Sequence, residues 1–160
     1  MRHPTLIVLA VSTLALAACN PFHRDPVTEV SRDSNVNARW SASLVTPAAL
    51  AGAVQMNGSA SMQPGPSSDN TDFSLRVANA TPGGLHPWQV HRGRCGADYG
   101  VFGQADAYRA MKIGDDGRGE TGATIAERTP TTGDYFVVVY ASAANPETVL
   151  ACGNLAPPAR

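Results

Sequence analysis

Residues Tyr135–Ser142, YFVVVYAS, are the stretch of this sequence that favours a β-strand most strongly. Aromatic and β-branched residues fill the stretch, and a Gly-Asp turn pair precedes it. A second stretch, Thr71–Ala78, places Phe73, Leu75 and Val77 at every other position, which is the two-residue period of a half-buried strand. No segment shows a sustained helical period, so the sequence predicts a β protein.

Further strands are predicted where alternating residues are bounded by turn signals. They are expected at residues 38–45, 52–62, 85–91, 119–125 and 149–155. Residues 63–70 (QPGPSSDN) are expected to form a loop, and residues 96–110 favour no particular structure. Residues 115–117 (DDG) predict a plain turn, because the other ligands of a calcium-binding loop are missing. Many short strands with frequent turns indicate an all-β sandwich or a Greek-key barrel.

The N-terminus, MRHPTLIVLAVSTLALAACN, has the pattern of a secretory signal peptide: a short basic region and an apolar run too short for a permanent membrane anchor. Its end, Leu16-Ala17-Ala18-Cys19, resembles the lipobox of bacterial lipoproteins, whose cysteine is lipidated after cleavage just before it. We therefore predict a signal peptide at residues 1–18, lipidation of Cys19, a polar tether within residues 19–37 and one β domain at residues 38–157. The alternative is an ordinary signal peptide followed by a free cysteine.

The expected location is the bacterial cell envelope, with the lipid at Cys19 as the contact with the membrane. Asn20 follows the cysteine where a signal for retention in the inner membrane is usually Asp. The resemblance to sorted lipoproteins therefore implies the outer membrane, facing the periplasm. A formal net charge of −1 without a basic patch argues against nucleic acid as a partner.

The sequence has three cysteines, an odd number for an exported protein. If Cys19 carries lipid, Cys95 and Cys152 form the one available pair, and an oxidising compartment favours a disulfide between them over two free thiols. Chain-entropy reasoning for a loop of this length gives a stabilisation of roughly 4 kcal/mol.

Three segments resemble the Cu/Zn superoxide dismutases. Residues 84–91 (GLHPWQVH), followed by Cys95, are similar to the G-L-H-G-F-H-V-H … C segment of that family. Residues 137–140 (VVVY) resemble its late L-V-V-H strand, and residues 150–153 (LACG) resemble its C-terminal L-A-C-G, whose cysteine pairs with the one after the histidine segment. The resemblance covers roughly residues 38–155 and implies a Greek-key β-barrel of about eight strands.

The family's metal chemistry does not carry over to these residues. The positions of its four copper histidines are occupied here by Gln89, His91, Val101 and Tyr140, so one ligand of four is retained. Val149 occupies the position of the arginine that attracts superoxide. The predicted domain contains two histidines in all, His86 and His91, and no histidine follows them, so the family's zinc loop is absent as well.

The two remaining histidines are expected to be structural. In the family, the histidine that matches His86 is not a ligand, and its ring braces loops through backbone hydrogen bonds. His91 is interpreted as an interior histidine, the alternative being a weak copper ligand together with Tyr140 and Gln89. Trp88 is expected to pack in the fold rather than to serve as a binding platform.

These features predict a lipid-anchored envelope protein with a superoxide dismutase-like fold, no catalytic residues and no cofactor, acting as a binding or structural module. One alternative is a metal-handling relative, either an active dismutase or a periplasmic copper-binding protein that uses His91. Another is an unrelated exported β-sandwich in which such a histidine segment recurs without catalysis. The sequence indicates neither a protein partner nor an oligomeric state.

Overall fold

The computed structural model describes residues 39–158, which are all-β with ten strands and no α-helix. The predicted signal peptide, Cys19 and the tether lie outside the described residues. The strands are β1 (Trp40–Val45), β2 (Asn57–Pro64), β3 (Thr71–Ala78), β4 (Leu85–His86), β5 (Trp88–Arg94), β6 (Ala97–Val101), β7 (Met111–Lys112), β8 (Gly119–Ile125), β9 (Tyr135–Ser142) and β10 (Asn145–Leu155). Two short 3₁₀ helices, η1 (Ala48–Leu50) and η2 (Ala105–Ala107), lie in the connections.

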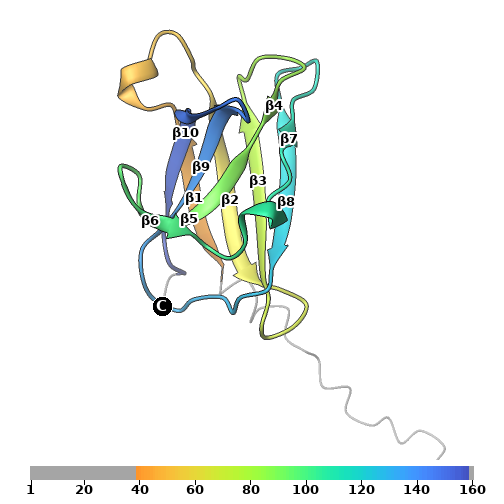
Figure 1. The fold of residues 1–160 in the computed structure, drawn as a ribbon, viewed down its shortest axis with the longest axis vertical. Helices are drawn as coiled ribbons and strands as arrows, with labels where there is room; N and C mark the ends of the chain where they lie inside the picture. The colour runs from red at the N-terminus through yellow and green to blue at the C-terminus, as the bar shows by residue number, and fades with distance from the viewer. Residues whose placement is uncertain (1–38, 159–160) are drawn as a thin grey trace, which may run out of the picture. The chain divides into compact units, whose positions relative to one another are not determined.

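Eight of the strands form one antiparallel sheet in the order β6-β5-β9-β10-β1-β2-β3-β8, and β4 and β7 form a separate pair. The large sheet curls into a half-barrel (Figure 1). Consecutive strands are neighbours in the hairpins β1–β2, β2–β3, β5–β6 and β9–β10. The connections from β3 to β5, from β6 to β8 and from β8 to β9 instead join strands that are not neighbours in the sheet.

The hydrophobic core fills the concave side of the sheet. β1 shows how the sequence achieves this, because its residues alternate strictly between buried and exposed. Aromatic rings pack edge-to-face in the core; Trp88 and Tyr108 lie 5.1 Å apart between ring centroids, at 85°. The largest fully buried side chains are those of Trp40, Leu44, Met56, Met62, Leu75, Trp88, Met111, Ile113 and Ile125. Trp88 is therefore a core residue, and its indole N–H donates to the backbone oxygen of Arg109 at 2.9 Å.

Three predicted elements need correction. The single strand expected at residues 85–91 is two strands: β4 pairs with β7 and β5 with β9, and Pro87, which has no N–H to donate, separates them. The strand expected at 52–62 is β2, which begins at Asn57 and ends at Pro64, inside the predicted loop. The last strand begins at Asn145 rather than at residue 149, with register shifts on both sides of Val149.

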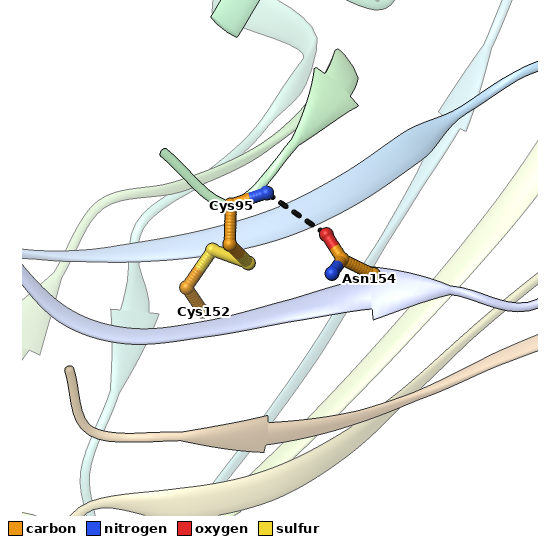
Figure 2. Close-up of a disulfide and its surroundings, with 3 residues drawn as sticks. All are labelled: Cys95, Cys152 and Asn154. Carbon is orange, nitrogen blue, oxygen red and sulfur yellow. Dashed lines mark hydrogen bonds between the residues drawn. A yellow bond between two sulfur atoms is a disulfide. The ribbon is translucent and has the colours of Figure 1, made fainter. Parts of the chain in front are cut away.

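The predicted disulfide between Cys95 and Cys152 is confirmed (Figure 2). Cys95 lies in the tight connection between β5 and β6, and Cys152 lies in β10. The backbone N–H of Cys95 also donates to Oδ1 of Asn154 at 2.8 Å. Because β9 separates β5 from β10 in the sheet, the bridge ties the β5–β6 hairpin to a strand it does not pair with.

Candidate functional site

The predicted site residues lie mainly on β5 and β9, which are paired neighbours. Residues on a strand alternate between its two faces, and Trp88, Val90 and the partners Val137 and Val139 belong to the core. The residues between them therefore face away from the core. These are Gln89 and His91 on β5 and Phe136, Val138 and Tyr140 on β9.

His91 is the centre of a hydrogen-bonded group on this outer face, and its side chain is only 6% exposed. Its Nδ1 lies 2.9 Å from Oδ1 of Asp98, on the next strand, β6. Its Nε2 lies 3.1 Å from Oε1 of Gln89 and 3.2 Å from the hydroxyl oxygen of Tyr140. The ring also packs on Phe136, with 5.3 Å between the centroids. We call these five residues the His91 cluster.

The partners of His91 determine how its protons are arranged. An ionised carboxylate can only accept, so Nδ1–H donates to Asp98. In the neutral ring Nε2 then accepts from the hydroxyl of Tyr140, whereas in the imidazolium form Nε2–H donates to Oε1 of Gln89. Both ring nitrogens are engaged in either state, so a metal ion at Nε2 would first have to displace the hydroxyl of Tyr140.

Two groups of the cluster region have perturbed pKa values. Burial acts to raise the pKa of Asp98, but the hydrogen bonds from the Gly100 N–H and from His91 outweigh it, and the net pKa lies below the ordinary value. Burial raises the pKa of Tyr140, and the nearby carboxylates of Asp98 and Glu147 raise it further. Asp98 is therefore a carboxylate and Tyr140 a phenol at neutral pH, in a negative local potential.

Two further predicted positions lie beside the cluster. Val101 on β6 is directly opposite His91 in the pairing of β5 with β6, and it packs partly against the core. Val149 on β10 is directly opposite Tyr140. The positions that the resemblance assigns to copper and to the cationic guide are thus neighbours in space, although they are spread from residue 89 to residue 149 of the sequence.

His86 lies apart from the cluster, in the short strand β4. It is 93% buried, and its Nδ1–H donates to the backbone oxygens of Tyr140 at 3.1 Å and Ala141 at 2.9 Å. Nε2 has no hydrogen-bond partner among the described residues. These bonds attach β4 to the end of β9, the strand that carries Tyr140.

Sequence reasoning missed Asp98, Phe136 and Glu147. Asp98 follows His91 by seven residues, in the segment to which no structure could be assigned. Neither Phe136 nor Glu147 belongs to a sequence motif that would have identified it. Among residues 39–158 no group of three or more His, Cys, Asp or Glu side chains could hold a metal ion.

A scan against protein-family models found no match to this chain, and a search of the curated proteins found none either. Within the described part of the chain, no helix has the length and apolar character needed to cross a membrane. What the His91 cluster can do must therefore be inferred from its own side chains.

Proposed function

We propose that this chain is a lipid-anchored protein of the bacterial envelope whose superoxide dismutase-like barrel acts as a non-enzymatic binding module. The anchor is Cys19, and the domain faces the periplasm from the outer membrane. The support for the anchor is the sequence Leu16-Ala17-Ala18-Cys19. The barrel carries no catalytic residues and needs no cofactor.

The strand order supports the Greek-key part of this proposal. A Greek key combines hairpins with a longer connection that returns a strand to the side of an earlier one. Here β8 returns beside β3 and β9 returns beside β5, each after strands that lie elsewhere in the sheet. The disulfide joins the two cysteines that the resemblance pairs.

The observation that carries the proposal is the convergence of the degenerate copper positions. Gln89 and Tyr140 each lie within hydrogen-bond distance of His91, and Val101 lies directly opposite His91. Gln89 and His91 lie on β5, and Val101 and Tyr140 lie on the two strands that flank it, which is the adjacency that the resemblance requires of these positions. Where the family has imidazole ligands, this chain has an amide, a phenol and an isopropyl group, which are poor ligands for copper.

The electrostatics agree with a loss of dismutation. A superoxide-consuming site attracts the anion with positive charge. Opposite Tyr140 this chain has the uncharged Val149, and the carboxylates of Asp98 and Glu147 raise the pKa of Tyr140 by their negative charge. An anion approaching this face would be repelled.

The test is metal retention measured together with superoxide consumption. The purified protein is loaded with excess copper and zinc, dialysed, and analysed for both metals. We expect less than one metal per chain and no dismutation that survives a chelator, in the wild type and in His91→Ala alike. Stoichiometric copper with chelator-resistant activity that the His91→Ala variant lacks would restore the enzyme hypothesis. Tight copper without activity would favour a periplasmic copper-binding protein.

A further inference from the structure

A groove of about 870 Å³ runs along the outer face of β1, β9 and β10, beside the His91 cluster. Its walls are mainly apolar: Val45, Val138 and Val149 contribute aliphatic side chains, and Phe136 and Tyr140 contribute rings. The disulfide in Figure 2 forms part of its lining. Val45 is 62% exposed, which is unusual for a large aliphatic side chain on this protein. The volume lies in the range of small-molecule sites.

The charge of the groove has one sign. Within residues 39–158, the charged side chains in its lining are those of Asp98 and Glu147, both carboxylates, and no lysine or arginine of that range lines it. Both carboxylates raise the pKa of the same phenol, Tyr140, so their negative potentials overlap at that ring.

These two carboxylates also differ from others on the protein in their pairing with lysine and arginine. Among residues 39–158 neither forms a salt bridge with a lysine or arginine, whereas Glu120, Glu127 and Asp134 each hold an arginine at 2.8 Å. Asp98 has His91 as its one ion-pair partner in that range. A ligand cation would therefore not have to displace a lysine or arginine from either carboxylate.

We propose that this groove binds a small organic cation, in which an ammonium group is attached to an apolar chain. The ammonium group lies against the ring of Tyr140 between the carboxylates of Asp98 and Glu147. Aromatic faces and carboxylates together are the groups that recognise alkylated ammonium ions. The apolar chain lies along Val45 and Val149, where it removes aliphatic surface from water. The inference rests on the proposed role as a binding module and names its class of ligand.

The test is calorimetric titration of the full-length protein, in a non-ionic detergent, with hexyltrimethylammonium. Two truncated probes separate the contributions: tetramethylammonium lacks the apolar chain, and hexanol lacks the charge. We expect saturable binding of hexyltrimethylammonium at one site, weaker binding of both truncated probes, and an affinity that falls as salt is added.

Charge-neutralising variants locate the site. Glu147→Gln, an exposed position in the groove, should weaken binding roughly fivefold, the effect of removing a charge near the cation at the protein surface. Glu120→Gln, which neutralises an exposed carboxylate outside the groove, is the matched control and should change nothing. Tyr140→Phe keeps the ring and should still bind, whereas Tyr140→Leu should bind more weakly.

Several outcomes would overturn the inference. The inference is wrong if hexyltrimethylammonium does not bind, or if hexanol binds as tightly as it does. It is also wrong if Glu147→Gln and Glu120→Gln weaken binding equally. A dimer that Val45→Asp dissociates would assign the groove to a second copy of the chain instead. If hexyltrimethylammonium does not bind, the results of the metal-retention and superoxide assays still stand. Conversely, stoichiometric copper with dismutation would contradict the proposed function but would not change the result of the titration.

Discussion

Removing the disulfide should destabilise the domain by about 4 kcal/mol. Cys95 and Cys152 are separated by 57 positions, and the loop-closure entropy that the bridge removes from the unfolded chain corresponds to about 4 kcal/mol for a loop of this length. The effect should be close to this full value, because a bond from the Cys95 N–H to Asn154 and the β9–β10 pairing continue to position both segments in the folded state. For a domain of this size, such a loss lowers the melting temperature by about 15 °C.

The assay is urea denaturation of the wild type and of a Cys95→Ala, Cys152→Ala double variant. A reductant should lower the stability of the wild type to that of the variant and leave the variant unchanged. Asn154→Ala is the matched control, since it removes the hydrogen bond but keeps the bridge; it should cost about 1 kcal/mol. A double variant destabilised by less than 1 kcal/mol would mean that the bridge does not stabilise the domain by restricting the unfolded chain.

Three further predictions concern the anchor, the His91 cluster and the β5–β6 hairpin. Cys19→Ser should move the protein from the membrane to the soluble periplasmic fraction; retention after a high-salt wash would argue against lipidation. Because folding lowers the pKa of Asp98, its carboxylate stabilises the folded state at pH values above the ordinary pKa of 3.8. This stabilisation is lost as the pH falls below that value. The difference in unfolding free energy between wild type and Asp98→Asn should thus shrink toward pH 3, and a pH-independent difference would contradict this. Gly93→Ala should destabilise the domain by more than about 1 kcal/mol in thermal unfolding, because φ is +109° and the added Cβ meets the backbone oxygen of Ala97; an unchanged melting temperature would count against it.

Local sequence signals were enough to predict several strands to the residue. Thr71–Ala78, Gly119–Ile125 and Tyr135–Ser142 have the predicted bounds, because each carries its periodicity or its β-branched residues within itself and is bounded by turns. The errors arose where strand pairing, rather than the pattern within a segment, sets the bounds. Pro87 ends one pairing and allows another, and β10 begins early because Asn145 pairs with Ser142 across the tight β9–β10 turn.

The site was predictable only in part, for a related reason. The resemblance named Gln89, His91 and Tyr140, which meet in the structure. The segment YFVVVYAS is apolar on both faces and therefore does not indicate which face is the core. Its sequence does not predict that Phe136 faces His91 while Val137 faces the core. Asp98 reaches His91 through a tight hairpin that contains glycines at positive φ, a geometry that alternation does not indicate.

Rebuilding the copper ligands would show whether the His91 cluster derives from a metal site. If the His91 cluster occupies a former copper site, Gln89→His with Tyr140→His places three imidazoles at positions whose side chains already meet. Val101 is left unchanged because its side chain packs partly against the core. Copper is measured after loading and dialysis, with circular dichroism to verify the fold. The double variant should retain one copper per chain and the wild type less than one; a folded double variant that retains no more copper than the wild type would rule out a former copper site at the His91 cluster.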